Sequence, residues 1–102
     1  MPVTYTLDDG AQTHREFPDT FQIPSQAERE NLKPGDLAKL IFRISNGDEV
    51  NVERMWVQVL EVSSQSYVGV LDNDPYCTNE IRSGMKVQFH PDHVIQIQGH
   101  AV

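Results

Sequence analysis

The chain has 102 residues and a mass of 11.6 kDa, which suits a single domain with one modest core. Its 8 basic and 15 acidic residues give a net charge of -7. Such a charge repels phosphate backbones and anionic lipid headgroups, so we expect neither nucleic acid nor a membrane surface as a partner. No apolar run approaches the roughly 20 residues that cross a bilayer.

The chain contains one cysteine, Cys77. A single cysteine forms no intramolecular disulfide and no thiolate zinc cluster, which fits a reducing compartment. The first ten residues show no basic segment followed by an apolar stretch, as a secretory leader would. We therefore expect a soluble, cytoplasmic protein.

Residues 1–24 are expected to form an extended N-terminal arm, because they are rich in proline and lack long apolar segments. Val3 to Leu7 alternates apolar and polar residues, which predicts a short edge strand, and residues 8–10 predict a turn. Residues 17–24 place prolines between apolar side chains. This pattern predicts an extended segment that packs its apolar side chains onto the domain.

A short helix is predicted near residues 25–32. Ser25 followed by Glu28 has the spacing of a capping box, in which each side chain bonds the other's backbone amide. Pro34 and Gly35 should end the helix, since proline cannot continue it and glycine permits a reversal.

From Gly35 onward the pattern predicts strands and turns. Residues 46 and 47 are the asparagine-glycine pair that favours a tight hairpin. Gly69 marks a kink or a close backbone approach within its strand. The apolar segments of the five predicted strands are Leu37 to Ile44, Val50 to Val62, Tyr67 to Leu71, Val87 to Phe89 and Val94 to Ile97.

The second of these strands changes its apolar side along its length. Val50 and Val52 place apolar side chains on even positions, whereas Met55 to Val59 places them on odd positions, and Leu60 returns to even. Such shifts are typical of a bulge or a sharp coil in a strand that bends between the sheets of a small barrel. We expect the apolar side to change between Val52 and Met55.

Together these elements predict a mainly β protein. Its core would be a small, five-stranded, partly open barrel that is Src-homology-3-like, because a proline-containing turn joins its last two strands. Residues 25–102 would form this barrel domain with its leading short helix. The likeness concerns architecture alone, so it implies no ligand.

Four motifs resemble a known bacterial family. They are the glycine-led segment 35–42, Glu53 shortly before Met55-Trp56-Val57, Asn73-Asp74-Pro75 within segment 69–75, and Gly84 ahead of the penultimate strand. Their order is similar to that of the family named domain of unknown function 2314, also described as YegJ-like. The resemblance implies a small, mostly β cytoplasmic protein of unestablished activity, with no catalytic residue to transfer. The family usually ends in an acidic-tryptophan element, so residues 95–98 indicate a divergent member.

Glu53 is the first candidate for a binding residue. On an unbroken strand it shares a face with Met55 and Val57, and an inward carboxylate must be paired, hydrogen-bonded or protonated. Lys39 or Arg43 on the neighbouring strand could supply an ion pair, or a bulge could turn Glu53 to water. The functional alternative is a polar anchor in a cleft.

The remaining candidate binding residues are aromatic or lie in the long polar loop from Asp72 to Gly84. Amphipathic aromatic side chains are favoured at binding surfaces, and loops on a rigid scaffold commonly carry recognition. The set is Trp56, Tyr67, Asn73 and Tyr76, with Glu53. We expect Trp56 and Tyr67 to line the cleft.

Catalytic and metal sites are not predicted. His90 and His93 flank a turn but are two ligands only, and Cys77 would need one of these histidines as its base. We expect no cofactor and no metal.

The expected function is a non-enzymatic protein- or peptide-binding module. The alternative is a small hydrolase or ligand-binding enzyme that uses Glu53 or Cys77 with His90 or His93. A homodimer could form through the edge strand near Val3 to Leu7.

Overall fold

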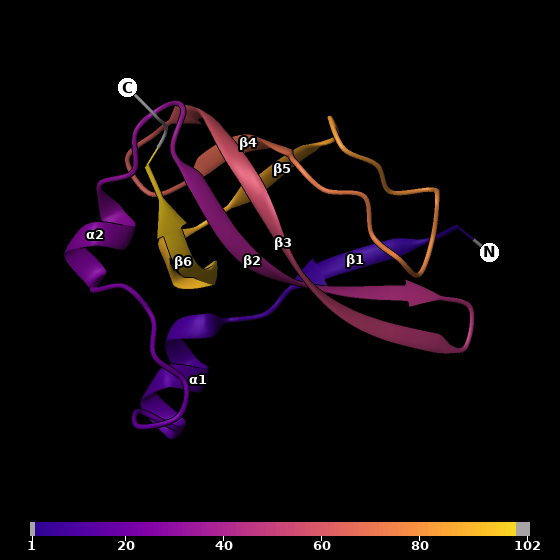
Figure 1. The fold of residues 1–102 in the computed structure, drawn as a ribbon, viewed down its shortest axis with the longest axis horizontal. Helices are drawn as coiled ribbons and strands as arrows, with labels where there is room; N and C mark the ends of the chain where they lie inside the picture. The colour runs from indigo at the N-terminus through magenta and orange to yellow at the C-terminus, as the bar shows by residue number, and fades with distance from the viewer. Residues whose placement is uncertain (1, 100–102) are drawn as a thin grey trace.

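The computed structural model describes residues 2–99, so the end of the predicted domain, residues 100–102, lies outside the described residues. The protein is mainly β: six strands form one strongly curled antiparallel sheet, shown in Figure 1. In chain order the elements are β1 (Thr4–Leu7), α1 (Gly10–Glu16), α2 (Gln26–Glu30), β2 (Leu37–Asn46), β3 (Glu49–Val62), β4 (Tyr67–Leu71), β5 (Lys86–Phe89), the 3-10 helix η1 (Pro91–His93) and β6 (Val94–Gln98). The strands β2 to β6 are the five predicted barrel strands, and β1 is the predicted edge strand.

The sheet curls into a half-barrel because β2 bonds to three strands. It pairs with β3 along its whole length, whereas β6 pairs with its first half and β1 with its second half. Beyond β3 the order continues through β4 to β5. A long strand shared in this way must twist and coil, so its inner face wraps around a single core.

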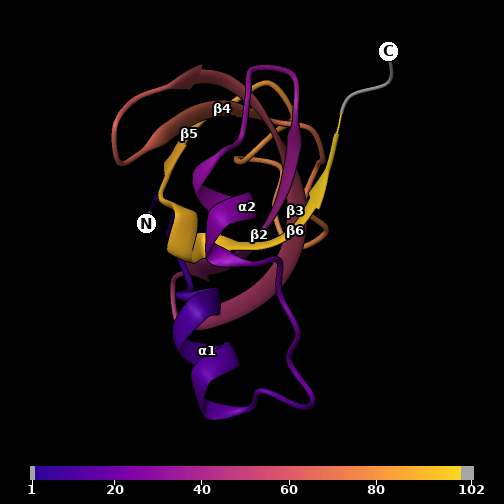
Figure 2. The same cartoon turned by 90° about the vertical axis from the view of Figure 1, so that its left-hand side faces the viewer.

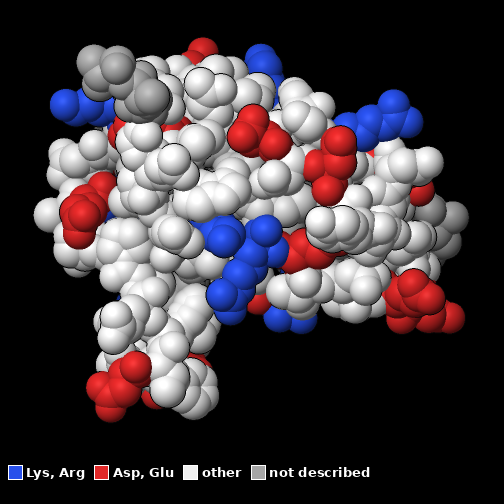
Figure 3. Space-filling model, viewed as in Figure 1, with Lys and Arg blue, Asp and Glu red and all other residues white. Residues whose placement is uncertain are grey.

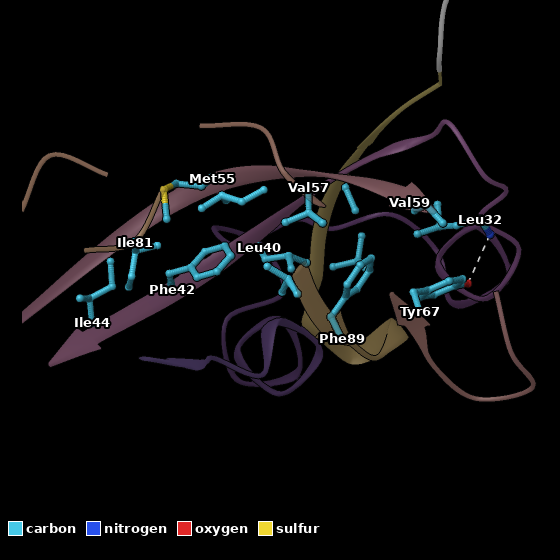
Figure 4. Close-up of a cluster of buried hydrophobic side chains, with 14 residues drawn as sticks. Leu32, Leu40, Phe42, Ile44, Met55, Val57, Val59, Tyr67, Ile81 and Phe89 are labelled. Carbon is cyan, nitrogen blue, oxygen red and sulfur yellow. Dashed lines mark hydrogen bonds between the residues drawn. The ribbon is translucent and has the colours of Figure 1, made fainter. Parts of the chain in front are cut away.

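The core lies on the concave side of the sheet. The inward residues of β2 and β3 alternate with outward ones, as the two-residue period of a strand requires. Phe42, Val57 and Phe89 are fully buried there, and Figure 4 shows these side chains packed between the strands. Fourteen buried residues form this cluster, which is small but continuous along the barrel.

Two short helices lie at one end of the barrel, on the left in Figure 1 and facing the viewer in Figure 2. The α2 helix begins as predicted: Ser25 caps it, and the capping box with Glu28 is present. None of the helices among residues 2–99 has the length and apolar character needed to cross a bilayer.

The N-terminal arm differs from the prediction, because α1 interrupts the expected extended chain. Asp9 acts as an N-cap instead of closing a turn, since its side chain accepts a hydrogen bond from the amide of Gln12 at 2.9 Å. The residues that follow from Ala11 to Glu16 have no proline and can continue the helix. The turn residues at positions 8–10 therefore start a helix.

The predicted shift in β3 between Val52 and Met55 is wrong. The pairing of β2 with β3 is regular from Leu37 to Asn46, so Val50 and Val52 simply lie on the outer face. The irregularity lies further along, where the register with β4 shifts between Val59 and Glu61. The exposed valines on the outer face produced the same change of apolar side in the sequence as a bulge would. Periodicity alone does not tell a buried valine from an exposed one.

Two glycines occupy the positions that the sequence indicated. Gly47 has a φ of 64°, and it alone supplies the positive φ of the turn between β2 and β3. Gly69 lets two strands approach closely: a Cβ there would overlap the carbonyl oxygen of Gln58 and lie 2.5 Å from a methyl carbon of Val57. A side chain at Gly69 would therefore push β4 away from β3.

Candidate functional site: a clamped loop beside strand β3

The loop of residues 72–84 lies at the opposite end of the barrel from the helices, on the right in Figure 1. It leaves β4 and runs beside the first half of β3. The amide of Asp72 donates to the carbonyl of Trp56 at 2.9 Å, and the amide of Trp56 donates to the side-chain oxygen of Asn73 at 2.6 Å. These bonds fix the start of the loop to β3.

Glu53 holds the middle of the same loop. Its carboxylate accepts hydrogen bonds from the backbone amide of Tyr76 at 2.9 and 3.1 Å, and from the amide of Cys77 at 3.0 Å. Because β3 is regular here, Glu53 lies on the same face as Met55, as an unbroken strand requires. The inward carboxylate is thus satisfied by backbone amides of the loop.

The hydrogen bonds keep Glu53 ionised. Partial desolvation raises the pKa of Glu53, but the amide of Tyr76 and the thiol and amide of Cys77 together outweigh it, so the pKa lies below its ordinary value. The predicted ion pairs do not form. Arg43 instead makes a two-bond pair with Asp8, at 2.8 and 3.0 Å, and Lys39 lies over the ring of Trp56.

The loop presents Tyr76 to solvent. Its side chain is 100% exposed, although its backbone amide is held by Glu53. Two further hydrogen bonds close the far end of the loop, from the amide of Ser83 to Asp74 at 2.8 Å and from the amide of Gly84 to Leu71 at 2.7 Å. Tyr76 is therefore an exposed aromatic side chain on a loop that hydrogen bonds hold in place.

Tyr67 does not belong to this surface, which corrects the expectation that it lines a cleft with Trp56. It is 3% exposed, and its hydroxyl donates to the carbonyl of Arg29 at 2.7 Å while accepting from the amide of Leu32 at 3.3 Å. Figure 4 shows the second of these bonds. Tyr67 joins the barrel to the segment after α2.

The five candidate binding residues thus divide by position. Glu53 and Asn73 hold the loop to β3, Tyr67 is buried at the other end of the barrel, and Trp56 is half-buried on the outer face of β3. Tyr76 alone among them is fully exposed.

No sequence pattern singled out Arg29, which is 7% exposed. Its guanidinium donates to the carbonyls of Pro24 and Pro91 at 3.0 and 3.1 Å and lies 3.3 Å from a carboxylate oxygen of Asp92. Arg29 therefore connects the arm, α2 and η1. Its position in a charged helix is typical of a solvent-facing residue, so only the tertiary contacts identify it.

Cys77 is not brought together with the histidines. Its polar neighbour is the carboxylate of Glu53, and burial together with this carboxylate raises the pKa of the thiol above its ordinary value. His90 and His93 lie at the other end, where His90 Nδ1 is 3.0 Å from the carbonyl oxygen of Gln65. A thiol that resists ionisation is a poor nucleophile.

The two histidines form a hydrogen bond with each other rather than with the thiol of Cys77. The amide of His90 donates to His93 Nδ1 at 3.0 Å, and the two rings are 5.4 Å apart. Burial and the neighbouring His90 lower the pKa of His93, so its ring is neutral at pH 7 and can accept this bond. Within residues 2–99 no group of three or more His, Cys, Asp or Glu side chains is arranged to hold a metal ion.

Comparison with known families identifies the chain. Residues 6–97 match a family described as an uncharacterized protein conserved in bacteria, DUF2314, which confirms the resemblance seen in the motifs. Neither the curated proteins nor the solved structures gave a match. The matched segment runs from within β1 to within β6, so it includes the loop and the residues that clamp it. The protein therefore belongs to the bacterial family of domain of unknown function 2314.

Proposed function

We propose that this chain is a cytoplasmic, non-enzymatic module of the small Src-homology-3-like barrel type that binds a protein or peptide partner through the loop 72–84. The observation that carries the proposal is the full exposure of Tyr76 on a loop fixed by Glu53. Tyrosine supplies a large amphipathic contact area, and a loop that is already ordered loses little entropy when it binds. A lone free cysteine fits the cytoplasm.

The neighbouring edge of β3 supports a polypeptide partner. The backbone of Trp56 faces away from β2, because it bonds with the loop instead. Alternate residues of a strand face the same way, so Val50, Val52 and Arg54 also turn their backbone groups away from β2. Among residues 2–99 no other segment bonds to the backbone groups of Val50, Val52 and Arg54, so this stretch of the edge is unpaired.

The side chains along this edge favour an apolar partner segment. Val50 is 55% exposed and Val52 is 49% exposed, although both lie in a strand whose opposite edge is paired with β2. An extended peptide that adds a strand gains backbone hydrogen bonds from the edge and apolar contact from the valines. We infer that the partner contributes an extended segment with an apolar side chain beside Val52 and a contact to Tyr76.

Self-association through β1 is a second proposal for a partner. In the part of the chain that the structure describes, β1 pairs with β2 along one edge only. A second copy could pair with its other edge, and the two-fold symmetry would make the contact reciprocal. Light scattering at high protein concentration tests this proposal: the mass of a dimer supports it, and a monomer at all concentrations contradicts it.

The binding proposal is tested by capture of a partner from a bacterial lysate with the untagged protein immobilised, followed by mass spectrometry. The same capture is then made with Tyr76→Ala, Val52→Lys and Phe17→Ala. Phe17 is a matched control, because it is 56% exposed but lies at the end of α1. A partner that is retained by the wild type and Phe17→Ala but lost by the other two variants supports the proposal.

Backbone NMR shifts give the complementary result. Addition of the purified partner should move the amides of residues 50–54 and 72–84 and leave those of α1 in place. A partner retained equally by all three variants, or shifts confined to the helical end of the barrel, would show that the loop is not the binding surface.

A further inference from the structure

Two basic side chains lie near each other on the outer face of β2 and β3. Lys39 precedes the fully buried Leu40, so it points outward, and its cross-strand partner is Trp56. Arg54 lies two positions before Trp56 on β3, directly opposite Ile41. Figure 3 shows basic atoms lying together near the middle of one face of this acidic protein.

A small hollow lies between these two side chains and the arm. Its volume is about 170 Å³, and it is bounded by residues 20–22 of the arm, Lys39, Arg54 and residues 95–96. Ile95 is the extra residue of an irregularity where β6 passes Lys39 and Leu40, which bends β6 at this point. The hollow is therefore formed where three segments meet.

The polar residues around the hollow all carry hydrogen-bond donors. Besides Lys39 and Arg54 they are Thr20, Gln22 and Gln96, and the lining contains no carboxylate. This is unusual for a chain with 15 acidic and 8 basic residues. An anion in this hollow would meet donors and no like charge.

Neither cation is neutralised by a carboxylate in the part of the chain that the structure describes. The two recorded ion pairs join Arg29 to Asp92 and Arg43 to Asp8. Lys39 and Arg54 contact aromatic rings instead: Lys39 Nζ lies 5.3 Å from the centre of the Trp56 ring, and Arg54 Cζ lies 5.6 Å from that of Phe21. A ring holds a cation in position without cancelling its charge.

From these observations we propose that the hollow between Lys39, Arg54 and Gln96 binds an oxyanion group of carboxylate or phosphate size. The guanidinium of Arg54 offers two parallel N–H donors to such a group, and the ammonium of Lys39 offers a second positive charge. Thr20 and the two glutamine amides donate to the remaining oxygens. The group belongs either to a small free anion or to the end of a larger ligand, since the volume admits little more.

The net charge of -7 opposes anion binding elsewhere on the surface, so the site depends on its local cations. Binding should weaken as ionic strength rises, because Lys39 is partly exposed and Arg54 is exposed to screening ions. This site lies apart from the loop, because it uses side chains of the outer face near Trp56 and of the arm, whereas the loop presents Tyr76. The two proposals share Arg54 alone, which offers its backbone to the β3 edge and its side chain to the hollow.

The experiment uses the full chain and Trp56, its only tryptophan, as the reporter. Sodium phosphate and sodium acetate are titrated separately at constant ionic strength set with sodium chloride, and an acidic hexapeptide is titrated in a third arm. An anion that neutralises Lys39 should change the Trp56 emission to saturation. Saturation by phosphate alone identifies a phosphate-type group, whereas saturation by acetate or the peptide identifies a carboxylate.

Substitutions of the two cations test whether the anion binds in the hollow. Lys39→Gln and Arg54→Gln should each raise the dissociation constant of the saturating anion by roughly tenfold or more, as loss of a charge-assisted hydrogen bond does. Lys86→Gln, which removes an exposed lysine from β5, should leave it unchanged. Because Lys39→Gln also alters the surroundings of Trp56, the affinities are measured in parallel by the rise in melting temperature with anion concentration.

The proposal is overturned if no arm gives a saturable change at constant ionic strength. It is equally overturned if Lys86→Gln weakens binding as much as Lys39→Gln and Arg54→Gln do, since the effect would then reflect overall charge. A saturable effect that survives in both Lys39→Gln and Arg54→Gln would place the anion elsewhere and also refute it.

Discussion

The carboxylate of Glu53 accepts hydrogen bonds from the backbone amide of Tyr76 at 2.9 and 3.1 Å, although the two residues are 23 positions apart in the chain. This contact joins the exposed aromatic residue of the loop 72–84 to the first half of the longest strand. From the sequence, Glu53 could have been an ion-pair partner or a binding group. In the structure it holds the loop in place.

Glu53→Gln should loosen the loop without unfolding the barrel. A glutamine oxygen can still accept from one amide, but its NH₂ group cannot accept from the other. The loss is expected to be about 1 kcal/mol, below the roughly 1.5 to 3 kcal/mol of hydrogen bonds to charged groups, because the site is partly solvated. Denaturant unfolding measures it. Amide hydrogen exchange at Tyr76 and Cys77 should become faster, whereas Glu61→Gln on the exposed side of β3 should leave both unchanged.

The clamp should also weaken in acid. The pKa of Glu53 in the folded protein lies below the value of about 4.3 expected in the unfolded chain. As the pH falls between these two values, the unfolded chain takes up more protons, so the stability present above the unfolded pKa is lost as the pH passes through the folded one. The difference in unfolding free energy between the wild type and Glu53→Gln should therefore shrink from pH 6 to pH 3. A constant difference would contradict this origin.

Cys77 should react slowly with thiol reagents at neutral pH. Burial and the carboxylate of Glu53 raise its pKa, so less thiolate is present than in a free cysteine. The rate of alkylation by iodoacetamide should rise with a midpoint above the ordinary thiol pKa. In Glu53→Gln the negative charge is gone, so the midpoint should move to lower pH. The same midpoint in both proteins would mean that the carboxylate does not act on the thiol.

Gly69→Ala should destabilise the protein by about 1 to 3 kcal/mol, the usual cost of forcing extra volume into a packed region. The added methyl group would meet the Gln58 carbonyl and Val57, so β4 must shift from β3. Gly99→Ala is the control, because a Cβ there meets nothing within 4 Å. Thermal unfolding of the two variants compares them, and equal melting temperatures would show that β3 and β4 can separate without cost.

Tyr67→Phe tests the link between the barrel and the helical end. The hydroxyl of Tyr67 serves both the Arg29 carbonyl and the Leu32 amide, and its loss leaves two buried groups unsatisfied. We expect a loss of about 1 to 3 kcal/mol. Tyr5→Phe removes a hydroxyl from the partly buried ring that packs on Phe42, and no hydrogen bond to that hydroxyl is recorded. A similar loss in both variants would mean that the hydrogen bonds of Tyr67 contribute little.

Local patterns in the sequence determined most of the fold. The capping box at Ser25, the glycine at position 47 and the alternation in β2, β4 and β5 each act within a few residues, so they can be read without the tertiary structure. The motif order likewise indicated the family that the comparison confirms. Gly69 marked a close approach, although the sequence did not show that Gln58 is the neighbour.

The candidate site depended on contacts that no local pattern contains. Glu53 was singled out as a carboxylate on an apolar strand face, Tyr67 as an aromatic residue and Asn73 as part of the polar loop. Their hydrogen-bond partners lie 23, up to 38 and 17 positions away, respectively. These residues and their partners come together only when the strands pair, because the curl of the sheet determines which loop lies beside which strand. The sequence by itself determined the strands, the hairpin turn at Gly47 and the family of this protein. The tertiary structure decided that Glu53 holds the loop and that the loop exposes Tyr76.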